Sequence, residues 1–164
     1  MSQSKHVHLQ MIQGVINRLS HDSFLLKGWA VVLIAALFAL SANSANIQFV
    51  YLAYLPSVVF WGLDGYFLRQ ERLFRKWYDY VRLLPEDKID FSMDVSQVSD
   101  QVRSWLEVVA SKTLLAFHGV ILLSIILVVG ISLSLEEGRA HGTQGFLQFR
   151  LQLRLESQPN PRHA

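Results

Sequence analysis

The chain has 164 residues, of which 51% are hydrophobic, with no cysteine and a formal net charge of +2. The lack of cysteine excludes a disulfide framework, a thiol nucleophile and a thiolate metal site, and so small a net charge does not indicate a partner nucleic acid. The hydrophobic residues concentrate in three runs, 24–42, 47–63 and 113–135. Each run has about the length of a membrane crossing. The composition therefore predicts an all-α integral membrane protein, because lipid offers unpaired backbone groups no partner.

Residues 1–23 predict a short amphipathic helix. Apolar residues recur at helical spacing from Val7 to Leu19, with amide and basic side chains on the opposite face. The polar sequence Ser20–Ser23 then has the form of a helix start. We expect the amphipathic helix to lie in the inner headgroup layer or to pack against the cytoplasmic part of the core. The first crossing then begins after Ser23.

Residues 24–84 predict a transmembrane hairpin that continues into the cytoplasm. The uncharged link 41–46 is short, so the second crossing runs back antiparallel to the first. Pro56 predicts a kink in the second crossing, and Pro85 ends its continuation. Residues 69–82 hold five bases and two acids. By the positive-inside rule they lie in the cytoplasm, and so does the N-terminus.

The continuation carries side chains that are candidates for contact with the membrane interface or a partner. Its apolar stripe predicts packing against the N-terminal helix or a neighbouring protomer. Its bases predict binding of anionic lipid or, as the alternative, docking of an acidic partner or of the acidic loop that follows. We expect Asp64 to pair with Arg69 or with a base of the N-terminal helix, or else to have a functional partner. The candidates are Trp61, Asp64, Arg69, Arg72, Arg75, Lys76 and Trp77.

Residues 85–112 combine an acidic loop with a lead-in helix. The segment 86–99 is acidic and lacks a clear periodicity, which predicts an exposed loop. Helical spacing returns in 98–112, where Trp105 predicts an anchor at the membrane interface.

The third run, 113–135, predicts another transmembrane segment and is followed by a strand-like tail, 136–164. His118 is a polar group within the run, and we expect it to bond to a neighbouring helix. A full crossing places the tail outside, although its arginines favour the inside, so a re-entrant run is the alternative. Strict alternation over 149–156 predicts a strand that pairs with other protomers or with a partner's sheet. The apolar face of this strand comprises Phe149, Leu151, Leu153 and Leu155.

The sequence contains no recognised catalytic pattern. His6 and His8 are spaced by two, which does not direct two imidazoles from one face of a helix toward a metal. Glycine-rich phosphate loops and nucleophile–base motifs are absent from the sequence. We therefore predict a protein that is not an enzyme, with no catalytic residue, metal or cofactor.

The stretches 60–75 and 23–29, together with Phe91–Asp94 and Ser104–Trp105, resemble small bacterial membrane proteins of two or three crossings. The resemblance covers roughly residues 8–120. Proteins of this kind are similar in layout to the SLATT-type membrane effectors that accompany antiphage defence systems. It implies an inner-membrane protein that self-associates and permeabilises or depolarises the membrane when a cytosolic sensor triggers it. SLATT proteins typically have two crossings, whereas this chain adds a third apolar run and a tail. The alternative is a membrane anchor or adaptor that recruits a cytosolic enzyme or sensor.

Overall fold

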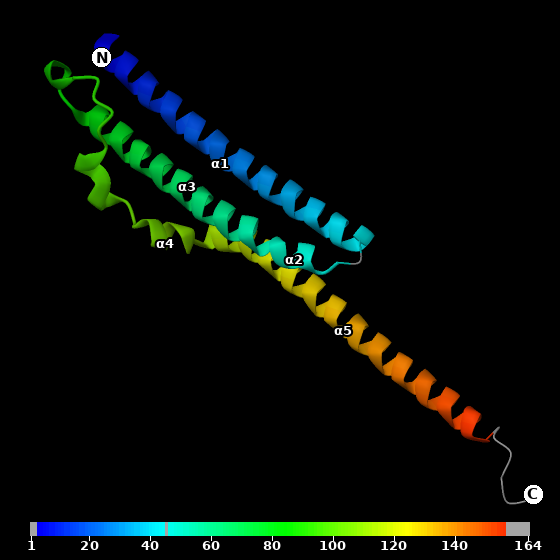
Figure 1. The fold of residues 1–164 in the computed structure, drawn as a ribbon. Helices are drawn as coiled ribbons and strands as arrows, with labels where there is room; N and C mark the ends of the chain where they lie inside the picture. The colour runs from blue at the N-terminus through cyan, green and yellow to red at the C-terminus, as the bar shows by residue number, and fades with distance from the viewer. Residues whose placement is uncertain (1–2, 45, 157–164) are drawn as a thin grey trace, which may run out of the picture. The chain divides into compact units, whose positions relative to one another are not determined.

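The computed structural model describes residues 3–44 and 46–156, and every regular element in these ranges is helical (Figure 1). The predicted all-α class is thus confirmed for the described residues. The chain forms two compact units that divide after Ile125. The elements are α1 (Gln3–Ser44), α2 (Gln48–Leu52), α3 (Tyr54–Leu83), η1 (Glu86–Lys88), η2 (Ser96–Gln101), α4 (Trp105–Val109) and α5 (Lys112–Glu156), where η denotes a 3₁₀ helix.

Helix α1 is continuous where the sequence predicted an amphipathic helix, a cap and a separate crossing. The helix break predicted at Ser20–Ser23 is therefore wrong. Residues 20–23 include neither proline nor glycine, so nothing in the backbone of this stretch stops a helix. Serine is favoured at caps because its hydroxyl can bond to a nearby backbone group, but the Ser23 hydroxyl donates to a side chain of another helix.

Helices α1 and α3 lie side by side and run antiparallel, as the short link predicted (Figure 1). At the link, the Ser41 hydroxyl donates to the carbonyl of Asn46 at 3.0 Å. The return segment is divided at Ala53, between α2 and α3. Pro56 accounts for this division, because it has no N–H to donate to the carbonyl of Leu52 four residues earlier. Helix α3 ends at Leu83, and Leu84 before the proline is extended.

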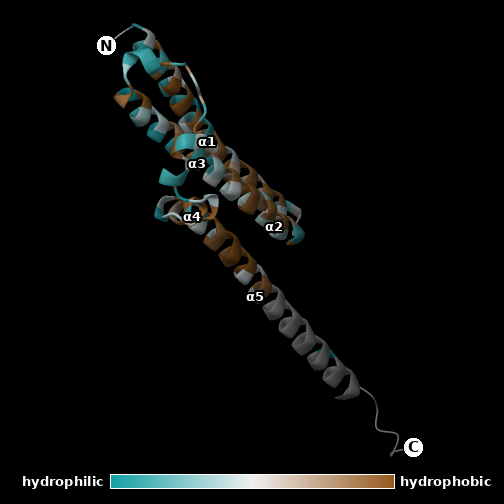
Figure 2. Ribbon diagram, turned by 90° about the vertical axis from the view of Figure 1, so that its left-hand side faces the viewer, coloured by the Kyte–Doolittle hydropathy of each residue, from teal (hydrophilic) through white to brown (hydrophobic). Residues whose placement is uncertain are grey.

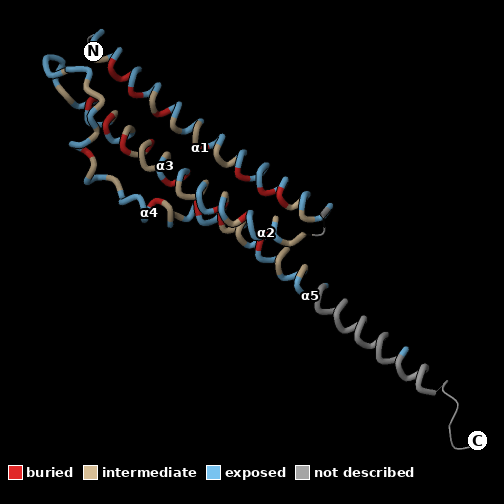
Figure 3. Tube along the Cα trace, viewed as in Figure 1, coloured by how far each residue is buried: buried red, intermediate tan, exposed pale blue. Residues whose placement is uncertain are grey.

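An apolar core joins the N-terminal part of α1 to the C-terminal part of α3 (Figure 3). Trp77 is 3% exposed in this core, and its indole N–H donates to the carbonyl of Ser92 at 3.0 Å. The same carbonyl accepts a hydrogen bond from Nε2 of His8 at 2.9 Å. Both bonds hold the loop against the two helices. The buried members of the core are Leu9, Ile12, Ile16, Trp77, Val81 and Val98.

The segment 86–99 is thus only partly the exposed loop that the sequence predicted. Val98 is 1% exposed, and Ile89, Met93 and Val95 pack on the core. The acids remain outside. The backbone amide of Ser96 donates to the Asp94 carboxylate, and this bond is the main cause that lowers the pKa of Asp94; the Ser96 hydroxyl, which also donates to it, is the second cause. The same two bonds order this turn of the loop.

Helix α4 packs closely on α3. Ser104 caps it, because the Ser104 hydroxyl accepts from the amide of Glu107 while the Glu107 carboxylate accepts from the amide of Ser104. At Gly65, an added Cβ would lie 2.4 Å from Cγ2 of Val109, so only glycine permits this approach. Two indole N–H groups connect α3 and α4. Trp61 donates to the carbonyl of Val109 at 3.0 Å, and Trp105 donates to the carbonyl of Gly62 at 3.1 Å.

Two helical segments in the described part of the chain are long and apolar enough to cross a membrane, Gln3–Asn43 and Lys112–Leu135 (Figure 2). Only 22% and 17% of their most apolar windows are buried within the protein, so most of each apolar surface lies open. Helix α3 is not one of the two, since its apolar part is interrupted at Ala53 and is followed by charged residues. These features support a membrane protein by length and composition alone.

The strand predicted at 149–156 is wrong, because α5 continues to Glu156. An isolated strand leaves its backbone groups unpaired, whereas a helix satisfies them within the segment. Leucine, glutamine, arginine and glutamate in this stretch are also favourable in helices. The side chains of Phe149, Leu151, Leu153 and Leu155 lie outside the described residues.

Candidate functional site

Asp64 of α3 is completely buried and accepts hydrogen bonds from two other helices. From α1, the Ser23 hydroxyl donates to Oδ1 at 2.5 Å, and the Lys27 ammonium donates to the same oxygen at 2.6 Å. From α5, Nε2 of His118 lies 3.1 Å from Oδ2. We call Ser23, Lys27, Asp64 and His118 the polar cluster. It joins the three longest helices of the described chain at one point.

Lys27 of the polar cluster is held by several contacts but remains partly exposed to solvent. Its side chain is 25% exposed, compared with none of the Asp64 side chain. Its ammonium also donates to the Ser23 hydroxyl at 2.9 Å and lies 6.0 Å from the centre of the Phe117 ring. Ser23 precedes Lys27 by four residues, so both project from one face of α1. Together their donors stabilise the charged form of the carboxylate.

The histidine of the polar cluster is fixed by stacking as well as by its hydrogen bond. The His118 ring lies 5.8 Å from that of Trp61 at an interplanar angle of 13°. Its side chain is 1% exposed, and among the described residues its Nδ1 has no hydrogen-bond partner. Because a carboxylate only accepts, Nε2 carries the proton in this bond. The ring is therefore held by one hydrogen bond and by stacking, with its other nitrogen buried.

The polar cluster does not have the geometry of a catalytic triad. In that arrangement the histidine takes the proton of the serine, but here Ser23 and His118 bind opposite oxygens of the same carboxylate. No group of three or more metal-ligating side chains occurs in the described chain. The arrangement can hold the charges of Asp64 and Lys27 between helices.

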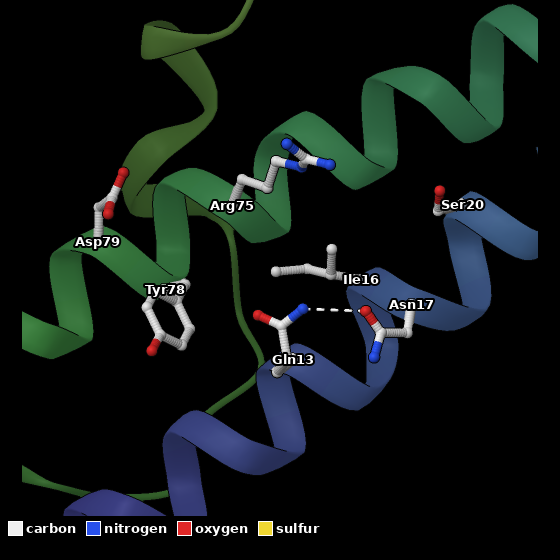
Figure 4. Close-up of a pocket in the computed structure, with 7 residues that line it drawn as sticks. All are labelled: Gln13, Ile16, Asn17, Ser20, Arg75, Tyr78 and Asp79. Atoms are coloured by element: carbon white, nitrogen blue, oxygen red, sulfur yellow. Dashed lines mark hydrogen bonds between the residues drawn. The ribbon is translucent and has the colours of Figure 1, made fainter.

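A second region surrounds Arg75. It lies in the part of α3 that follows the polar cluster, residues 65–83, which we call the extension of α3. On one side, α1 and α3 enclose a cleft of about 400 Å³ (Figure 4). The side chains shown there are mostly polar, and Gln13 donates to Asn17 at 2.9 Å. On the other side, α3 and the segment after η2 enclose a cleft of about 270 Å³. Its basic side chains are Arg72, Arg75, Lys76 and Arg103, and we call it the basic cleft.

The structure brings together some of the residues that the sequence singled out and separates others. Asp64 and His118 belong to the polar cluster, and Trp61 stacks on His118 beside it. Arg72, Arg75 and Lys76 line the basic cleft. The charge partner of Asp64 is Lys27 of α1, whereas the Arg69 Nε–H donates to the carbonyl of Arg103. Trp77 lies in the core rather than on a surface open to a partner.

Sequence reasoning missed Ser23, Lys27 and Arg103 as parts of these sites. The spacing of Ser23 and Lys27 by four at the start of an apolar run was a usable signal, since it places both polar groups on one face of a helix. Arg103 gave no such signal, because its position depends on how the segment after η2 packs on α3.

The chain was compared with known families, characterised proteins and solved structures. It matches no family model, and no characterised protein or solved structure is significantly similar to it.

Proposed function

We propose that this chain is a multi-pass bacterial inner-membrane protein with a cytoplasmic N-terminus, which self-associates and permeabilises or depolarises the membrane in antiphage defence. The polar cluster is the observation that carries the proposal. Ionisable groups among apolar helices are costly and are therefore functional candidates. Here they tie together helices whose remaining apolar surface is largely open, which supports contact with lipid or with further copies of the chain.

The proposed mechanism is a change in how the three helices are held. With Asp64 bound to both Lys27 and His118, α1, α3 and the start of α5 stay closed around their polar groups. When this hold is lost, the same groups become available to water or to another copy. Assembly of several copies then places these polar side chains around the inner end of a path between the copies. The defence setting rests on the resemblance to SLATT-type effectors.

Membrane potential in bacteria that express the full chain tests this function. We expect induced expression to depolarise the cells, and Asp64→Asn to do so at a lower level of protein, because its neutral amide holds Lys27 less strongly. A loss of about 1.4 kcal/mol from the closed state raises the open fraction about tenfold. Asp79→Asn is the matched control, since Asp79 is an exposed acid of the same helix, and it should behave as the unaltered chain does.

The effector function is contradicted if neither the unaltered chain nor Asp64→Asn depolarises cells while both accumulate in the membrane fraction. The second candidate function, an anchor or adaptor for a cytosolic enzyme or sensor, would then be preferred. The polar cleft between α1 and α3 supports this alternative, because the two helices offer amide, hydroxyl and guanidinium groups to a ligand there (Figure 4). Recovery of the same cytosolic protein with the chain, lost on Asn17→Ala, would favour the adaptor.

A further inference from the structure

The basic cleft concentrates positive charge on the extension of α3. Arg72, Arg75 and Lys76 come from that helix and Arg103 from the segment before α4, with Asp79 as the acid among the lining residues. The cleft differs from its neighbour across Arg75, where the charged lining residues are one arginine and one aspartate. The two clefts therefore favour different ligands, although they share a wall.

Most of this charge is not neutralised by the protein. Arg75 is paired with Glu71 at 2.5 Å, and Asp79 with Arg82 at 3.6 Å. Among the described residues, the side chains of Arg72, Lys76 and Arg103 have neither an ion pair nor a hydrogen bond that would compensate them. Arg72 and Lys76 are four residues apart on one helix, where like charges destabilise each other. A bound anion would relieve this repulsion.

The cleft is also held in shape without a ligand. The Nε–H group of Arg69 donates to the Arg103 carbonyl at 3.2 Å, which fixes the backbone of Arg103 beside α3. The next residue, Ser104, begins the capping box of α4. Binding therefore requires little ordering of the backbone, which lowers its cost.

We propose that the basic cleft binds a soluble anion that bears phosphate groups. Guanidinium groups bind phosphate oxygens through paired N–H donors, and a lysine ammonium adds a point charge. The volume of about 270 Å³ lies near the lower limit for ligand pockets. It suits a diphosphate moiety better than a bulky organic anion.

A soluble source is favoured over a lipid headgroup by the position of the cleft, a step that rests on the proposed membrane placement. Lys27, Trp61, Asp64 and Lys112 mark the inner edge of the apolar segments. Arg72 and Lys76 follow Asp64 by about 12 and 18 Å along the helix, at about 1.5 Å per residue. A headgroup layer is only about 5 to 8 Å thick, so the cleft extends beyond it into water.

Binding of inorganic pyrophosphate to the full chain in detergent tests the proposal by calorimetry. We expect saturable binding that weakens with salt, and at least a tenfold loss of affinity in Lys76→Gln/Arg103→Gln. The matched control is Arg18→Gln/Lys88→Gln, which removes the same charge from exposed positions outside the cleft and should retain affinity within about twofold. All four side chains are exposed, and circular dichroism checks that the variants keep their helices.

Equal losses in the two double variants would overturn the proposal, because they would show attraction by net charge alone. Absence of saturable binding to the unaltered chain would overturn it as well. In nanodiscs, an uncharged phosphatidylcholine bilayer and one containing phosphatidylglycerol should give the same pyrophosphate affinity. Competition by the anionic lipid would identify a headgroup as the occupant and would overturn the soluble source. None of these measurements depends on membrane permeabilisation, so they can fail or succeed separately from the proposed function.

Discussion

Replacing Asp64 with alanine is expected to lower the free energy of unfolding by about 3 to 5 kcal/mol, the usual cost of removing one partner from a buried ion pair. The carboxylate is completely buried and accepts from Ser23, Lys27 and His118. Without it, a buried hydroxyl and a buried imidazole lose their acceptor, and Lys27 must move toward solvent. Chemical unfolding of the full chain in detergent, followed by circular dichroism, measures the loss.

Two further variants separate the polar cluster from general effects of charge. Asp79→Ala should change stability by less than about 1 kcal/mol, since Asp79 is exposed and its ion pair with Arg82 is long. Lys27→Met should cost less than Asp64→Ala, because Asp64 keeps its bonds to Ser23 and His118. The combination Lys27→Met/Asp64→Ala should cost less than the sum of its single changes, as expected for directly coupled residues. Additive losses would show that the two side chains do not interact.

Replacing Trp77 with alanine has the second large expected effect, a loss of about 3 to 5 kcal/mol, typical of truncating a large aromatic core residue. The side chain is 3% exposed and holds the loop through its bond to Ser92. Stability and the rate of tryptic cleavage after Lys88 measure the change. We expect cleavage to accelerate, because both the core and the bond that anchors the loop are lost.

Tyr80→Ala is the control for this prediction. The Tyr80 ring stacks on Trp77 with centres 5.1 Å apart, but its side chain is 38% exposed. It should therefore cost clearly less than Trp77→Ala and leave the loop protected. If the two variants lose stability equally, Trp77 acts through surface stacking and not as the centre of the core.

The sequence was sufficient for the features that depend on local signals. The uncharged link predicted the antiparallel arrangement of α1 and α3, and Pro85 predicted the end of α3. Pro56 predicted an irregularity, which the structure places at Ala53. Each of these features follows from residues that lie close together in the chain and act on their own backbone.

The errors come from local patterns that have two physical meanings. Ser20–Ser23 has the composition of a cap, yet α1 passes through it and the Ser23 hydroxyl binds Asp64 rather than a backbone group. The alternation over 149–156 is typical of a strand, yet the backbone is helical there. In both cases the pattern describes side-chain polarity, whereas the outcome depended on which backbone hydrogen bonds were available.

The polar cluster could be anticipated only in part. Asp64 and His118 each stood out as ionisable groups beside apolar runs, but they are 54 residues apart. Periodicity identifies the face of a helix, not the helix that this face meets. Gly65 lets α4 approach α3 closely, and α5 begins shortly after α4 ends.

The central claim of the proposed function is that α1 and the return segment formed by α2 and the start of α3 make a hairpin in the membrane, with the rest of α3 on the inner side. Labelling of single cysteines tests it most directly. The natural chain has no cysteine, so Asn43→Cys and Lys88→Cys each introduce one reactive site at an exposed position. A membrane-impermeant maleimide is added to spheroplasts at low expression. We predict that the cysteine at 43 is labelled at once and the cysteine at 88 only after the membrane is permeabilised. Labelling of 88 in intact spheroplasts, or recovery of the chain as a water-soluble protein, would contradict the account.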